Sequence, residues 1–112
     1  MNDAEAATQR AEIIAKLKAL KLRFAAEGVG IVGIFGSYAN GTCDRFSDVD
    51  IAYEIDRETF SRRYRDGFGK ILRLEEIRKI LESELHKRVD LVPLHSRNRR
   101  FLEQIRREMV YV

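Results

Sequence analysis

Two short stretches of the sequence carry residue types suited to phosphate chemistry. Gly36-Ser37 is followed, after ten residues, by Asp48-Val49-Asp50. Alternate residues of a strand point to the same face, so Asp48 and Asp50 are expected to project together, roughly 6–7 Å apart. Carboxylates at that spacing repel each other unless a cation lies between them. Mg²⁺ is the natural candidate, because it is commonly held by one or two carboxylates together with substrate phosphates.

A third acid, Asp90, lies within the apolar run Val89–Val92. An acid in a buried strand is costly unless it is paired or ligated. If this strand neighbours the one that carries Asp48 and Asp50, the three carboxylates converge on one patch. Three carboxylates could hold two metal ions, the arrangement that clamps the attacking and leaving oxygens in phosphoryl and nucleotidyl transfer.

Gly36 and Ser37 stand where a buried strand ends and a helical turn begins. A glycine there lets the backbone approach a phosphate closely. N–H groups at a helix start, together with the Ser37 hydroxyl, can bind a triphosphate. A plainer interpretation stays open, in which Asp48 and Ser37 cap local structure while Asp50 and Asp90 make ordinary hydrogen bonds.

These stretches together resemble the nucleotidyltransferase superfamily related to DNA polymerase beta, and the short chain is similar to its minimal branch, the MNT or MntA-like proteins. The resemblance extends from about Val29 to the C-terminus. It is carried by Gly36–Gly41, Ser47–Ile51 and Val89–Val92.

The resemblance implies a role for each of these site residues. Asp48 and Asp50 would bind one or two Mg²⁺ ions, and Asp90 would complete the metal site and help to activate an acceptor hydroxyl. Gly36 and Ser37 would grip the triphosphate of ATP or another NTP. One departure concerns Asn40, since many family members carry arginine there.

The family also implies a partner. Its minimal members are often antitoxins encoded beside a HEPN-domain toxin, which they neutralise by transferring AMP to a tyrosine and by forming a complex. This resemblance favours a protein acceptor, with nucleic acid reached through the partner, and it allows an oligomer.

Two other functional classes stay open. A non-catalytic binding subunit would block a partner by contact alone, without Mg²⁺ or NTP. A nucleic-acid-binding module would bind in a salt-dependent way, and only clustered arginines support it. Solvated helix faces are the simpler explanation of the same arginines. The clusters are Arg62, Arg63 and Arg65; Arg97, Arg99 and Arg100; and Arg106 and Arg107.

The apolar pattern predicts the elements that must position the site. A helix spans the first 28 residues, with Asn2 or Asp3 as its cap and Gly28 as its stop. β-Branched residues predict buried strands, and a helical period returns between the second strand and the third. The predicted strands are 29–35, 49–55 and 89–92, and 110–112 is a candidate terminal strand.

Three helical segments are expected after the second predicted strand. Residues 56–69 are expected to form a short helix that ends in a loop at Asp66-Gly67-Phe68-Gly69. The next helix begins near Ile71, with Glu75 and Lys79 paired at i,i+4. A last helix carries Phe101, Leu102, Ile105 and Met109 on one side.

The expected fold is α/β (α+β), a small mixed sheet flanked by helices, formed by one domain over 1–112 with its catalytic core in 29–112. The glycine fingerprint Gly28–Gly33 is no dinucleotide site, because it ends a helix and runs into a strand. A lone cysteine, Cys43, and the lack of an apolar run or secretory signal predict a soluble cytoplasmic protein. The net charge of +3 is too balanced to indicate a nucleic-acid binder by itself.

Overall fold

A mixed four-stranded sheet forms the centre of the computed structural model, which describes residues 1–95 and 98–112. β1 pairs antiparallel with β2 on one side and with β4 on the other, while β2 pairs parallel with β3. The sheet order is β3-β2-β1-β4. This confirms the expected mixed sheet. The strands are β1 (Val29–Phe35), β2 (Val49–Ile55), β3 (Val89–Pro93) and β4 (Val110–Tyr111).

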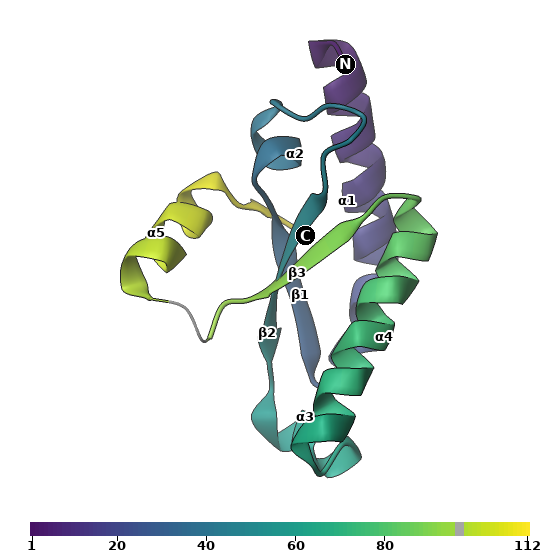
Figure 1. Cartoon of the computed structure of the whole chain (residues 1–112), viewed down its shortest axis with the longest axis vertical. Coiled ribbons are helices and arrows are strands. Elements are labelled where there is room, and N and C mark those ends of the chain that lie inside the picture. Colours follow the sequence, from purple (N-terminus) through teal and green to yellow (C-terminus); the bar gives the residue numbers. More distant parts are fainter. Residues whose placement is uncertain (96–97) are drawn as a thin grey trace.

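Helices lie on both faces of this sheet. Figure 1 shows α1 and α4 together on one side and α5 on the other. The short α2 follows β1, and α3 follows β2 at the opposite end of the molecule. The helices are α1 (Asp3–Ala25), α2 (Ser37–Asn40), α3 (Arg57–Arg63), α4 (Gly67–Leu85) and α5 (Arg99–Glu108).

The alternation of side chains along β2 divides the core in two. Val49, Ile51 and Tyr53 are buried in the larger cluster with α1 and α4. Ala52 belongs to the smaller cluster, beneath α5. Because successive side chains of a strand point to opposite faces, Asp50 shares the α5 face with Ala52.

Polar residues at the helix starts fix where the helices begin. The side chains of Asn2, Asp56, Asp66 and Asn98 each accept a hydrogen bond from a backbone N–H in the first turn of the following helix. Such caps satisfy donors that have no partner inside the helix. Asn2 rather than Asp3 is therefore the cap of α1.

The expected loop at 66–69 is wrong. α4 begins at Gly67, and Asp66 caps it by accepting from the Gly69 N–H. Glycine lowers helix propensity, but a good cap and the 19 residues of α4 outweigh two glycines in its first turn. The predicted start near Ile71 was thus one turn late.

The expected Glu75–Lys79 interaction is present as a charge effect, since hydrogen bonding to Arg78, then the charges of Arg78 and Lys79, hold the pKa of Glu75 below its ordinary value. Glu75 forms its ion pair with Arg78, which donates from Nε at 2.9 Å as well as from its terminal nitrogen. Arg78 also contacts Glu82 at 2.9 Å. The forked guanidinium reaches both carboxylates, whereas a lysine offers a single charged nitrogen.

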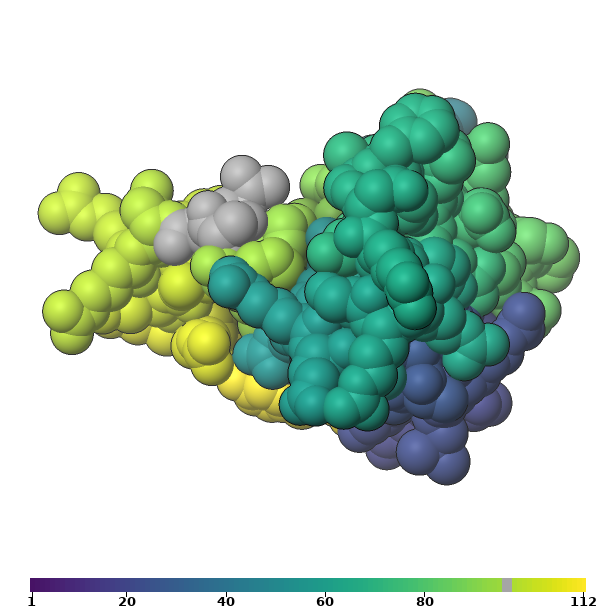
Figure 2. Space-filling view, turned by 90° about the horizontal axis from the view of Figure 1, so that it is seen from below, coloured from purple at the N-terminus to yellow at the C-terminus, as the bar shows by residue number. Residues whose placement is uncertain are grey.

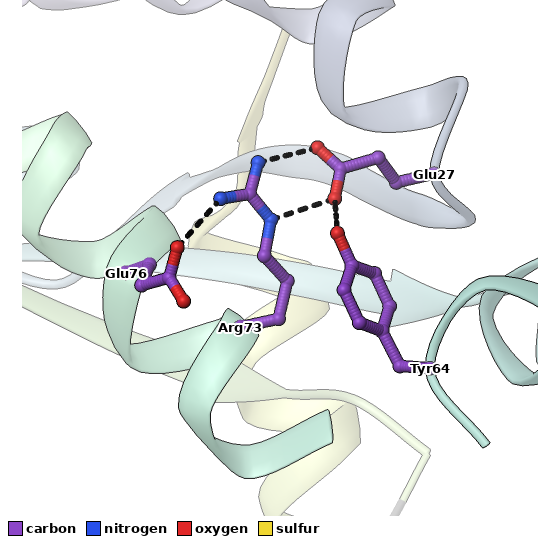
Figure 3. A network of polar contacts seen from close by, with 4 residues as sticks. All are labelled: Glu27, Tyr64, Arg73 and Glu76. Carbon is purple, nitrogen blue, oxygen red and sulfur yellow. Dashed lines mark hydrogen bonds and ion pairs between the residues drawn. The ribbon is translucent and has the colours of Figure 1, made fainter. Parts of the chain in front are cut away.

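Four polar side chains, here called the Glu27 clasp, join the end of α1 to α4 (Figure 3). Glu27 is only 6% exposed and accepts two hydrogen bonds of 2.6 Å from Arg73 and one of 2.6 Å from the Tyr64 hydroxyl. Arg73 also donates to Glu76 at 3.1 Å. Pairing with Arg73 holds the pKa of Glu27 below its ordinary value in spite of burial. The Glu27 clasp therefore keeps a charged carboxylate inside the protein.

The C-terminal segment returns to the sheet as predicted. Leu102, Ile105 and Met109 pack in the smaller core cluster. Phe101 differs from the expectation, since it is 38% exposed. β4 then pairs with β1, with Val110 opposite Ile34.

Exposed ion pairs join residues four apart on α3 and on α5. Arg62 pairs with Glu58 and Arg99 with Glu103, and both pairs are exposed. Arg97 of the second arginine cluster lies outside the described residues. Figure 2, seen from below, shows α5 projecting on one side, with α3 and the start of α4 facing the viewer. Within 1–95 and 98–112, every helix is too short or too polar to cross a membrane.

Candidate active site

The parallel pairing of β2 with β3 places two of the predicted acids side by side. Asp50 and Asp90 are direct register partners. Neighbouring strands lie about 4.8 Å apart, and paired residues project from the same face. Val92 and Leu94 of this part of the chain pack beneath α5, so Asp90 lies on the α5 face with Asp50. The condition stated for the acids to converge, that their strands be neighbours, is thus met for Asp50 and Asp90.

Asp48 lies just before β2 begins, on the exposed rim of the same patch. Its carboxylate is 3.2 Å from Nε of Arg88, and both side chains are largely exposed. Exposed ion pairs contribute little to stability, so Arg88 leaves Asp48 free to exchange partners. Asp48 is near enough to Asp50 to raise the pKa of that carboxyl.

Gly36 lies directly against the carboxylate of Asp50. A Cβ added to Gly36 would be 3.2 Å from Cγ of Asp50 and would overlap Oδ2. Gly36 also has φ +73°, a backbone conformation that favours glycine. Position 36, at the end of β1 and next to Asp50, can therefore hold only glycine.

Ser37 begins α2 immediately after Gly36. The N–H groups of Ala39 and Asn40 both donate to the Gly36 carbonyl, at 3.1 and 3.0 Å, which closes the turn. The N–H groups at the very start of a helix have no acceptor inside it. Ser37 and the start of α2 therefore present donors beside Asp50, as an anion cradle requires.

Asn40, the residue that departs from the family pattern, makes local hydrogen bonds in the turn after α2. Its side-chain oxygen accepts from the N–H of Thr42 at 3.0 Å and from the Thr42 hydroxyl at 2.6 Å. The amide thus stabilises the turn after α2. Asn40 therefore has a local structural role in this chain.

The electrostatics of the patch centre on Asp50. Burial, followed by the charges of Asp90, Asp48 and Glu108, raises the pKa of Asp50 from 3.8 to about 6. Two of these causes were predicted from the sequence, whereas Glu108 was not. Glu108 ends α5, and no motif links it to the other acids.

These residues fit a divalent cation in their chemistry. They offer carboxylate oxygens, which hard cations prefer, and mutual repulsion that a cation would relieve. Among residues 1–95 and 98–112, however, no three acidic, histidine or cysteine side chains form a ready-made metal cage. In proteins, Mg²⁺ is commonly held by one or two carboxylates together with substrate phosphate oxygens.

Comparison with known proteins agrees with this fold. The family model described as polymerase beta, nucleotidyltransferase matches residues 9–112. The protein adenylyltransferase MntA of Thermococcus cleftensis is 34% identical over 100 residues, which cover 89% of this chain and 88% of that protein.

Two solved structures are also similar. One is the structure of a minimal nucleotidyltransferase, with a TM-score of 0.65 and 27% identity, covering 96% of this chain and 95% of that one. The other is a crystal structure of a toxin–antitoxin with AMP-PNP. It has a TM-score of 0.59 and 26% identity, and the match covers 91% of this chain and 70% of that one.

Proposed function

This chain belongs to the polymerase beta nucleotidyltransferase family, and on that premise we propose that it transfers AMP from ATP to a hydroxyl of a partner protein. The observation that carries the proposal is the register of Asp50 with Asp90, beside a glycine that contacts Asp50. The enzyme is a nucleotidyltransferase. ATP as donor is supported by the adenylyltransferase relative and by the structural neighbour crystallised with AMP-PNP.

Each residue of the patch has a proposed role. Gly36 and Ser37 bind the triphosphate through backbone N–H groups and the serine hydroxyl. Asp48 and Asp50 would hold Mg²⁺, and Asp90 would complete its site. When bound, Mg²⁺ supplies charge neutralisation at the phosphates in the transition state.

The reaction then needs little covalent chemistry from the protein. The acceptor hydroxyl oxygen forms a bond to the α-phosphorus, the bond from that phosphorus to the bridging oxygen breaks, and pyrophosphate leaves. Asp90 accepts a hydrogen bond from the acceptor hydroxyl and orients it. Its carboxylate also takes the proton as the new bond forms. Positioning of the two reactants supplies much of the acceleration.

A protein acceptor is supported by an apolar surface on α4. Phe68, Ile71 and Leu72 are 73%, 68% and 47% exposed, and they recur at helical spacing on the first turns of α4. An exposed apolar stripe of this kind indicates an interface. With the toxin–antitoxin neighbour, it favours a toxin partner, and we propose one of the HEPN family.

ATP labelled at the α-phosphate or at the γ-phosphate tests the reaction. Purified protein is incubated with Mg²⁺, each labelled ATP and extract of the source cells. The proposal predicts a protein band labelled from the α position only, sensitive to EDTA. Label from the γ position would indicate a kinase. An α-labelled nucleic acid in place of a protein would overturn the acceptor and keep the chemistry.

A further inference from the structure

Three nitrogen-bearing side chains gather around a hollow at the α3 end of the molecule. The hollow has a volume of about 380 Å³, and Arg57, Lys70 and His95 are among the residues that line it. Buried Tyr53 and Phe60 line it too, and the ring of His95 packs edge-on against Tyr53, with the ring centroids 6.3 Å apart. The described residues around the hollow include no acid. This composition favours an anionic ligand.

Arg57 and Lys70 are not paired with the acids nearest to them in the sequence. Asp56, the neighbour of Arg57, accepts hydrogen bonds from the N–H of Thr59 at 3.4 Å and from its hydroxyl at 3.0 Å. Asp66 caps α4 by accepting from a backbone N–H of its first turn. Among residues 1–95 and 98–112, neither Arg57 nor Lys70 forms an ion pair. Both cations are therefore available to a carboxylate from another molecule.

A second hollow adjoins the first along α4. It has a volume of about 450 Å³ and shares Tyr53 and Leu74 with the first hollow. Ile71 and Leu72 of the exposed apolar stripe line it, as does Leu91 of β3. The two hollows together are here called the α4 groove. The α4 groove thus joins an apolar stretch to the unpaired cations.

The charges of the α4 groove are distributed unevenly along α4. Lys70 lies at the basic end, whereas Arg78 at the other end pairs with Glu75 and, at 2.9 Å, with Glu82. From Lys70 to Arg78 the helix rises about 12 Å, the length of roughly four extended residues. A short segment with a negative charge at one end would therefore bind in one preferred orientation.

We propose that the α4 groove binds a segment of the partner protein that carries apolar side chains and, at its α3 end, an aspartate or glutamate. The inference rests on the proposed function, because it describes how the protein acceptor is recognised. The apolar side chains cover Ile71 and Leu72, and the carboxylate pairs with Lys70 and Arg57. Burial of apolar surface supplies affinity, while complementary charge selects the partner and its orientation.

The α4 groove is separate from the acids of the candidate site. Tyr53 lies three residues after Asp50 on β2, about 10 Å along the strand. Its side chain is buried in the cluster with α1 and α4, whereas Asp50 is on the α5 face. A partner bound in the α4 groove therefore leaves Asp50 accessible to ATP. Substitution of Lys70 is expected to leave the binding of Mn²⁺ by the acids unchanged.

Lys70→Gln in the α-labelled ATP assay tests this docking. The matched control is Lys18→Gln, which removes a charge from an exposed position of α1. At about 50 mM NaCl, Lys70→Gln is expected to label the protein acceptor about 5-fold less than the wild type, per folded molecule, and the control is expected to match the wild type. The deficit should shrink near about 500 mM NaCl, because salt screens surface charges. Arg57→Gln is expected to behave as Lys70→Gln does.

Four results would overturn the inference. One is a deficit in Lys70→Gln that is equal at both salt concentrations, which indicates a structural role for Lys70. Another is weaker Mn²⁺ binding in Lys70→Gln, followed by electron paramagnetic resonance, which places the effect among the acids. A wild type that sediments as a dimer, with Lys70→Glu as a monomer, would show that a second copy of the chain covers the α4 groove. An α-labelled nucleic acid whose labelling falls in Lys70→Gln would show that the groove binds nucleic acid.

The wild type separates failure of this inference from failure of the proposed function. If the wild type labels a protein from the α position and Lys70→Gln labels it equally well at low salt, the proposed function stands and the inference alone fails. If the wild type labels no protein, the proposed function fails and the inference falls with it.

Discussion

Gly36 lies so close to Asp50 that any side chain at position 36 would overlap the carboxylate. The contact joins the end of β1, where the triphosphate is proposed to bind, to the acid at the centre of the patch. The backbone of Gly36 and the carboxylate of Asp50 therefore constrain each other's positions. The requirement for glycine comes from both the positive φ and the neighbouring side chain.

Gly36→Ala is expected to abolish nucleotidyl transfer by displacing Asp50. Gly41→Ala is the matched control, because Gly41 also has a positive φ, +84°, but no atom lies within 4 Å of an added Cβ. Both variants should lose about 1–2 kcal/mol of unfolding free energy from backbone strain. Only Gly36→Ala should lose activity, measured as label transferred from ATP per folded molecule. Equal activity in the two variants would refute a role for the contact.

Asp50→Asn is expected to make the metal-free protein more stable at high pH. An acid with a raised pKa favours the folded state below its unfolded pKa, and this contribution is lost as the pH rises through about 6. Asparagine carries no charge to be repelled. The free energy of unfolding in urea should therefore be higher in Asp50→Asn than in the wild type, by on the order of 1 kcal/mol near pH 8, allowing for solvent screening. The advantage should vanish near pH 4. Destabilisation near pH 8 in EDTA would contradict this electrostatic account.

The Glu27 clasp is expected to stabilise the fold without acting in the chemistry. Arg73→Met leaves Glu27 buried without its cation and should cost about 3 kcal/mol in urea unfolding. Tyr64→Phe removes one hydrogen bond and should cost about 1 kcal/mol. Activity per folded molecule should persist in both, because the length of β1 separates Glu27 from Gly36. A smaller loss in Arg73→Met than in Tyr64→Phe would show that Arg73 does not neutralise Glu27.

Ile71→Glu is expected to weaken labelling of the protein acceptor. The substitution places a charge in the exposed apolar stripe of α4, and buried interface residues of this kind can change binding about 10-fold or more. Leu22→Glu is the matched control, since Leu22 is 78% exposed and belongs to α1 rather than to the α4 stripe. Mn²⁺ binding should be unchanged in both. Equal labelling by the two variants would exclude the stripe as the docking surface.

The sequence predicted the strands and the acid pairing well because these depend on a period of two. The apolar run of β1 and the alternation of side chains along β2 define which residues share a face. The position of Asp90 in an apolar run indicated a strand, and β3 does lie beside β2. Local chemistry therefore sufficed for this part of the candidate site.

Contacts between segments that are far apart in the sequence could not be predicted from these local patterns. Glu27 and Arg73 are 46 residues apart, and no periodicity links a helix end to the middle of another helix. The charge of Glu108 acts on Asp50 although the two residues are far apart in the sequence. The start of α4 was predicted one turn too late, because the Asp66 cap stabilises the first turn by more than the two glycines destabilise it.

The most direct test of the catalytic assignment compares Asp48→Asn with Glu54→Gln in the α-labelled ATP assay. Glu54 is an exposed acid of the same strand, β2, and lies outside the patch. The account predicts that Asp48→Asn transfers no label while it stays folded, and that Glu54→Gln transfers label as the wild type does. An active Asp48→Asn enzyme with wild-type dependence on Mg²⁺ would contradict the assignment.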